Sequence, residues 1–122
     1  MKLDNGTIAI EVAPHGAELT SLRKSDTEYL WQADPRYWAR HAPILFPIVG
    51  QVWNGTYRVD GTEYHLPQHG FARDRDFTPL EADNAIVMQL QSDDMTREVY
   101  PYDFLLTARY TLHANAVRIC WT

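Results

Sequence analysis

The fold class is best indicated by residues 56–66, which read TYRVDGTEYHL. Two runs rich in β-branched and aromatic residues, Thr56–Val59 and Thr62–Leu66, flank the dipeptide Asp60-Gly61. An Asp-Gly pair between two such runs favours a two-residue hairpin turn, because both turn positions need a positive φ. We therefore predict a β-hairpin over this stretch.

Short runs with a period of two lie on both sides of this hairpin and alternate with turn residues. Such spacing is typical of antiparallel strands and meanders rather than of βαβ units. We expect strands within residues 1–3, 7–12, 17–23, 85–91, 104–112 and 116–121, and short helical turns at residues 35–39 and 95–99. Residues 41–50 and 67–76 do not match this strand pattern, and we interpret both as loops that are kept for a function. The predicted fold class is all-β.

Composition limits the range of partners. Of the 122 residues, 45% are hydrophobic and 22% are charged, which is ordinary for a globular domain. The net charge of -5, with scattered positive residues, argues against a nucleic-acid partner. No apolar run approaches the ~20 residues of a membrane helix, and the first residues lack the pattern of a signal peptide. We expect a cytoplasmic protein with neither a nucleic-acid nor a membrane partner.

The last residues suggest an incomplete domain. Residues 116–121 read as a strand with Val117, Ile119 and Trp121 on one side, and no closing turn follows. Cys120 is the only cysteine, so no internal disulfide can form, as is usual in a reducing cytoplasm. We therefore expect a truncated domain with uncovered strands, and a possible homo-oligomer through exposed sheet edges.

The loop from Gln68 to Asp74 has the ingredients of a small-molecule site. It places an amide, an imidazole, a guanidinium and a carboxylate around Gly70. The imidazole of His69 can donate or accept near neutral pH, and Arg73 offers a rigid fork of donors. A polar loop with surface ion pairs, Arg73–Asp74 or Arg75–Asp76, accounts for the same residues, and their chemistry alone leaves both interpretations open.

Other kinds of site find little support. The six glycines are isolated, so no phosphate-binding loop is present, and no serine or cysteine has the context of a nucleophile. His65 and His69 are spaced for a shared metal only on a helix, which Pro67 between them disfavours. We predict neither a nucleotide site nor a metal site.

Two spaced motifs, residues 42–50 (APILFPIVG) and 67–73 (PQHGFAR), with residues 54–55 between them, resemble the aldose 1-epimerase family, and in particular its bacterial hexose-phosphate-like branch. The resemblance implies an antiparallel galactose mutarotase-like β-sandwich, of which residues 1–122 form the N-terminal part of a single domain. It also implies an isomerase that interconverts the α and β anomers of a hexose or hexose phosphate by acid–base ring opening, without a cofactor.

The same resemblance implies roles for two side chains. His69 matches the family's first active-site histidine, which holds the sugar near its ring oxygen, and is our catalytic candidate. Arg73 matches the arginine of the His-Gly-Phe-Ala-Arg segment and is a candidate for sugar binding. The family's second histidine and its glutamate base lie later in a longer chain, and nothing in residues 1–122 matches them.

Four further residues are candidates for substrate binding. Gln68 belongs to the polar loop, and Gln51 stands where many relatives have an arginine. Arg40 is a possible replacement for that lost charge. Of the tryptophans that could stack on a sugar, Trp53 is favoured over Trp31 and Trp38, because it follows the first motif and lies beside the Asn54-Gly55 turn.

The sequence leaves two other functions open. A non-catalytic carbohydrate-binding module on the same sandwich would need His69, Arg73 and an aromatic platform, but no acid or base. A fragment that only packs or assembles would bind no sugar.

Overall fold

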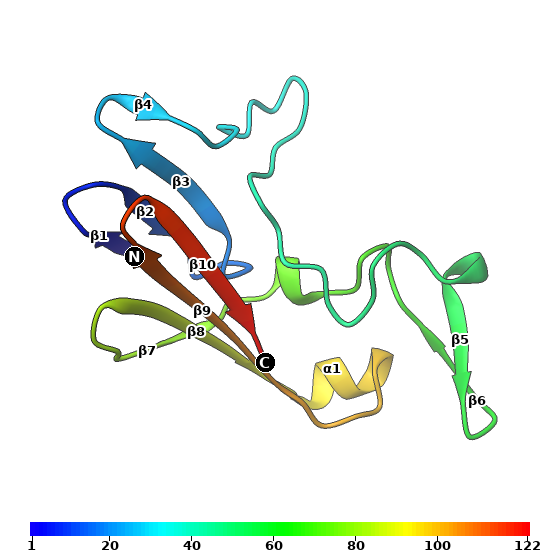
Figure 1. The fold of residues 1–122 in the computed structure, drawn as a ribbon. Coiled ribbons are helices and arrows are strands. Elements are labelled where there is room, and N and C mark those ends of the chain that lie inside the picture. The colour runs from blue at the N-terminus through cyan, green and yellow to red at the C-terminus, as the bar shows by residue number, and fades with distance from the viewer.

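The computed structural model describes residues 1–122 and contains two four-stranded sheets and one separate hairpin (Figure 1). All pairings between strands are antiparallel. The first sheet has the order β1 (Lys2–Asp4), β2 (Ala9–Val12), β3 (Leu19–Lys24), β4 (Thr27–Glu28). The second has the order β10 (Ala116–Trp121), β9 (Leu105–His113), β8 (Ala85–Gln91), β7 (Thr78–Leu80). The prediction of an all-β fold is confirmed.

The predicted hairpin is formed by β5 (Thr56–Val59) and β6 (Thr62–His65). Asp60 and Gly61 have φ values of 48° and 82°, as the turn requires. Tyr57 and Tyr64 are cross-strand partners with ring centroids 5.7 Å apart. The Tyr57 hydroxyl donates to the Val99 carbonyl at 2.7 Å, which ties the hairpin to helix α1 (Asp94–Val99).

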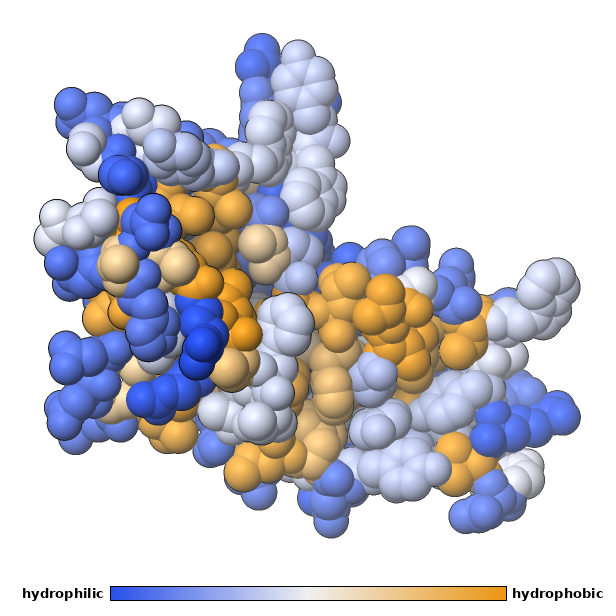
Figure 2. Space-filling model, in the orientation of Figure 1, coloured by the Kyte–Doolittle hydropathy of each residue, from blue (hydrophilic) through white to orange (hydrophobic).

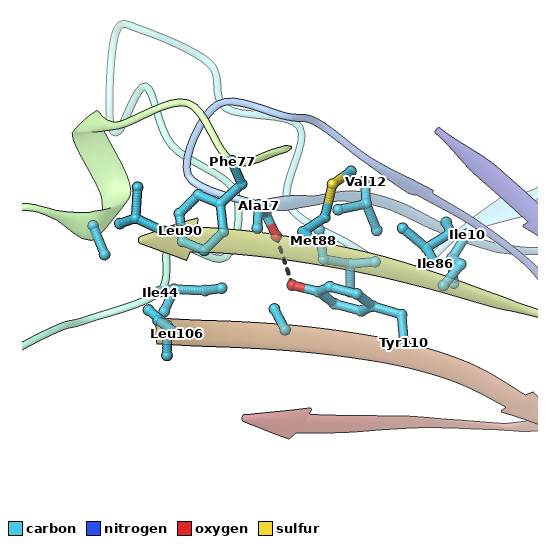
Figure 3. Packing of buried hydrophobic residues seen from close by; sticks show 13 residues of the cluster. Ile10, Val12, Ala17, Ile44, Phe77, Ile86, Met88, Leu90, Leu106 and Tyr110 are labelled. Carbon is cyan, nitrogen blue, oxygen red and sulfur yellow. Dashed lines mark hydrogen bonds between the residues drawn. The ribbon is translucent and has the colours of Figure 1, made fainter. Parts of the chain in front are cut away.

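The core lies between the two sheets. Figure 3 shows Ile10 and Val12 of β2 packed towards Met88 and Tyr110 of the second sheet. The hydroxyl of Tyr110 crosses the core and donates to the Ala17 carbonyl at 2.6 Å. Burial, with a smaller contribution from Glu18, raises the pKa of Tyr110 to about 12. The two sheets are therefore joined by one buried hydrogen bond as well as by apolar packing.

The short elements were predicted in part. Residues 35–39 contain a single hydrogen-bonded turn, as expected, in which the Asp34 carbonyl accepts from the amides of Tyr37 and Trp38. Strand β7 was not expected, and it contains Pro79, which an edge strand tolerates. Helix α1 begins with a capping box between Asp93 and Thr96. Single 3₁₀ turns occur at Trp53–Gly55 and Ala72–Asp74. No helix here has the length and apolar character needed to span a bilayer.

On its core-facing side, the second sheet stays apolar and accessible at the β10 edge. On the edge strand β10, Ile119 is 38% exposed and Trp121 is 59% exposed. Hydrophobic residues also gather at the surface between the sheets and the β5–β6 hairpin (Figure 2). An apolar cavity of about 340 Å³ lies at this side, with Ile44, Phe46, Leu106 and Trp121 in its wall.

We predict that this face drives self-association, because an unpaired strand edge and exposed apolar side chains both favour contact with another chain. Light scattering of the purified chain should give a mass above that of the 14.1 kDa monomer. The double substitution Ile119→Thr with Trp121→Ser should lower the measured mass. Trp53→Ser, at a tryptophan outside this face, is the control and should leave the mass unchanged. A monomer at every concentration would contradict the prediction.

Candidate functional site

The two loops that fitted no element, residues 41–50 and 67–76, are bound to each other through their backbones. The Phe46 carbonyl accepts from the amides of Phe71 at 2.9 Å and Ala72 at 3.2 Å. The amide of His69 donates to the Gly50 carbonyl at 2.7 Å. The loops, 19 to 26 residues apart in the chain at these contacts, therefore behave as one unit.

Gly70 makes this close approach possible. Its φ is +69°, and a Cβ atom at this position would lie 2.1 Å from the Phe46 carbonyl oxygen. A side chain would displace the very backbone to which the neighbouring amides are bound. Glycine is therefore required here for both conformation and space.

An aromatic cluster holds the paired loops against the second sheet. Phe46 lies 6.0 Å from Phe71, 6.0 Å from Tyr100 and 4.9 Å from Phe104, between ring centroids. Phe104 directly precedes β9, and Tyr100 follows α1. The ring of Phe71 packs in this cluster, so it anchors its loop.

A cavity of about 470 Å³ opens beside the paired loops. Its wall is formed by Trp38, Pro43, Leu45, Gln68, His69 and Arg73. Three of the predicted site residues, Gln68, His69 and Arg73, thus come together in one cavity. The volume is within the usual range for small-molecule sites.

The backbone fixes the tautomer of His69. The amide of Gly50 donates to Nδ1 of the imidazole at 2.9 Å, so Nδ1 is the acceptor. In the neutral ring the proton is then on Nε2, which is free to donate to a ligand. His69 itself has a φ of +68°, an uncommon conformation that the contacts with Gly50 hold on both sides.

The charges beside the cavity are partly neutralised. Asp74 lies between two arginines: its Oδ1 accepts from Nη2 of Arg40 at 2.7 Å, and its Oδ2 is 3.6 Å from Nε of Arg73. The Arg73 Nη2 donates to the Gln68 carbonyl at 2.9 Å. Nε of Arg73 is buried without a hydrogen-bond partner. The site therefore has an oriented guanidinium, but two arginines share one carboxylate.

The other candidates lie elsewhere. Trp53 is 87% exposed and lines no part of the cavity, and Gln51 is also exposed outside it. Arg40 does not line the cavity either, and its Nη1 donates to the Arg73 carbonyl at 3.4 Å. Trp38 takes the position in the cavity wall that we expected for Trp53. Which tryptophan faces the cavity depends on how the chain returns after residue 34, which no local pattern encodes.

The loop at residues 68–74 is also open to a second interpretation, a polar loop with a surface ion pair. Of the two possible pairs, Arg73–Asp74 and Arg75–Asp76, only the first is present. Arg73 and Asp74 do approach each other. Asp76 instead accepts from Nδ1 of His15 at 2.8 Å, and Arg75 pairs with Asp93 at the start of helix α1. These pairs fasten the loop to its neighbours and leave the imidazole of His69 at the cavity.

Comparisons with known proteins agree with the fold and extend over nearly the whole chain. A family model described as aldose 1-epimerase matches residues 1–120. Protein LacX of Lactococcus lactis subsp. lactis is 35% identical over 125 residues, which cover 97% of this chain and 42% of LacX. A galactose mutarotase related enzyme from Lactobacillus acidophilus superposes with a TM-score of 0.95 at 40% identity, over 99% of this chain and 41% of that one. A galactose mutarotase-like protein from Lactobacillus casei gives a TM-score of 0.94 at 33% identity, over 99% of this chain and 42% of that one. The chain thus spans less than half the length of these relatives.

The contact at Gly70 leads to a stability prediction. Gly70→Ala should lower the free energy of unfolding by about 1–3 kcal/mol more than Gly6→Ala does, because only the first substitution forces a side chain into backbone atoms. Gly6 is a matched control, since its φ is +80° and nothing lies within 4 Å of a Cβ built there. Urea denaturation of the two variants measures the difference. Equal losses would show that the loop contact is not tight.

Proposed function

Because this chain belongs to the aldose 1-epimerase family, we propose that the cavity at His69 is the sugar-binding half of a mutarotase-type active site. The observation that carries the proposal is the fixed imidazole: the Gly50 amide holds Nδ1, and Nε2 is left to donate beside Gln68 and Arg73. We propose that residues 1–122 form part of a single mutarotase-like domain. A cytoplasmic setting belongs to the same proposal and is supported by a single, exposed cysteine, Cys120.

The reaction requires two proton transfers. A base removes the proton of the anomeric hydroxyl while an acid protonates the ring oxygen, so the bond between C1 and the ring oxygen breaks and an open-chain aldehyde forms. Rotation about C1–C2 and reclosure, with the protons returned, give the other anomer. We assign to Nε2 of His69 the donation of a hydrogen bond at the ring oxygen, which polarises the bond that breaks. Arg73 and Gln68 hold the hydroxyl groups.

The proposal divides the work between two parts of the fold. The cavity wall in this chain includes no carboxylate, and Asp74 nearby is bound to two arginines. We propose that the general acid and the general base both come from the part of the domain that the relatives have beyond the 42% matched here. The same lack of a carboxylate favours, as the second candidate, a carbohydrate-binding module without catalysis.

Polarimetry of freshly dissolved α-D-glucose and α-D-galactose tests the division of work. We expect no acceleration above the solvent rate with this chain alone, and acceleration with a chimera in which the remainder of LacX follows it. In the chimera, His69→Ala should lower the rate by about 100-fold or more, whereas His113→Ala, at an exposed end of β9, should not.

The alternatives predict other results in the same experiment. Activity of this chain alone would place a complete acid–base pair within residues 1–122. Binding of sugar without acceleration, in the chain and in a folded chimera alike, would favour the carbohydrate-binding module.

The position of Asp74 leads to a prediction about phosphorylated sugars. Asp74→Asn removes the carboxylate that Arg40 and Arg73 share, so it should strengthen binding of glucose 6-phosphate by about fivefold at low salt, and binding of glucose little. Added salt should weaken the gain. Asp76→Asn is the matched control, because Asp76 pairs with His15 instead. Equal effects of both substitutions, measured by calorimetric titration, would show that the charge of the two arginines does not act on the phosphate.

A further inference from the structure

We infer that Trp38 is the stacking platform of the sugar cavity, on which the apolar C–H face of a hexopyranose lies while its hydroxyl edge meets Gln68 and His69. The inference rests on the proposed function and adds to it the residue that recognises the face of the ring. Trp38 lines the same cavity as these polar side chains and is 49% exposed.

Both backbone polar groups of Trp38 are hydrogen-bonded. Its amide donates to the Asp34 carbonyl at 3.0 Å, and its carbonyl accepts from the indole N–H of Trp31 at 2.9 Å. Figure 1 shows this segment within the long connection that leaves β4 and runs on to the β5–β6 hairpin. Both partners, Asp34 and Trp31, belong to the same connection. The position of Trp38 is therefore fixed by contacts within that connection.

The neighbouring aromatic side chains are already engaged. Trp31 meets Tyr37 edge to face, with ring centroids 6.2 Å apart and an interplanar angle of 72°. The guanidinium of Arg36 lies over the ring of Tyr37 at 5.7 Å and is itself bound to Asp34. The rings of Trp31 and Tyr37 therefore pack on each other, and both are engaged within the chain.

The ring of Trp38 has none of these partners. It makes no aromatic pair and no cation–π contact, and its indole N–H donates to no group of the chain. The ring face and the indole N–H of Trp38, a residue of the cavity wall, are therefore both unengaged within the chain. Trp53 is also unpaired, but it is 87% exposed and does not line this cavity.

The cavity wall divides in a way that suits a pyranose ring. Trp38, Pro43 and Leu45 form apolar wall, whereas Gln68, His69 and Arg73 supply donors and acceptors. A hexopyranose has the same division, because its axial C–H bonds form apolar patches and its hydroxyls lie around the edge. Aromatic rings bind such patches by dispersion and by the attraction of polarised C–H groups to the negative ring face.

The test uses sugars that bind but do not react. Methyl α-D-glucopyranoside and methyl α-D-galactopyranoside carry a methyl group on the anomeric oxygen, so their rings stay closed at neutral pH and the readout is independent of catalysis. In a ¹H–¹⁵N NMR titration of the native chain, we expect the indole signal of Trp38 and the imidazole signals of His69 to shift together. The indole signal of Trp53 should stay in place.

Substitutions give the second readout. Trp38→Ala should weaken binding about tenfold, Trp38→Phe should restore most of the affinity, and Trp53→Ala, the matched control, should leave it unchanged. Shifts at His69 without shifts at Trp38, or full affinity in a folded Trp38→Ala variant, would overturn the role of Trp38 and leave the proposed sugar site standing. A native chain in which no glycoside shifts either residue would overturn the sugar site itself.

Discussion

The contact on which the site depends is the pair of hydrogen bonds from the amides of Phe71 and Ala72 to one carbonyl, that of Phe46. This contact brings two irregular loops to within van der Waals distance and dictates glycine at position 70. It also brings Gly50 to His69, where one backbone amide and one backbone carbonyl hold the residue in an uncommon conformation. The orientation of the imidazole is thus a consequence of how two loops pair.

Backbone hydrogen bonds alone are a weak support for such loops. Each contributes about 1 kcal/mol net, because the unfolded chain makes equivalent bonds with water. The aromatic cluster adds to them, since rings in edge or tilted contact stabilise by about 0.5–1.5 kcal/mol beyond their burial. Phe46 belongs to both systems: its carbonyl binds the second loop and its ring packs on Phe104, next to β9. Phe46 therefore links the site to the core in two ways, and Phe71 in the same cluster and the buried side chains of Ile44 and Ala72 add to this attachment.

The sequence predicted those parts of the structure that local chemistry decides. The Asp60-Gly61 turn, the strand over Ala85–Gln91 and the last hairpin follow from positive φ and a period of two. The clustering of Gln68, His69 and Arg73 followed from their closeness in the chain. Three features of the site could not be predicted in this way. The amide that fixes His69 and the second arginine bound to Asp74 come from residues 19 and 34 positions away. The presence of Trp38 rather than Trp53 in the cavity wall depends on the path of a long connection. Local patterns carry no record of such contacts.

The segment at Pro43 and Leu45 links the two cavities of the molecule. Both residues line the polar cavity at His69, and both also line the apolar cavity beside Leu106 and Trp121. A single stretch of chain is thus the wall between them. Close-packed residues transmit strain to their neighbours, so we expect a shift of this stretch to change the shape of both cavities. Burial of the apolar side against another chain would restrain the stretch. We therefore expect the shape of the polar cavity to depend on what covers the apolar side.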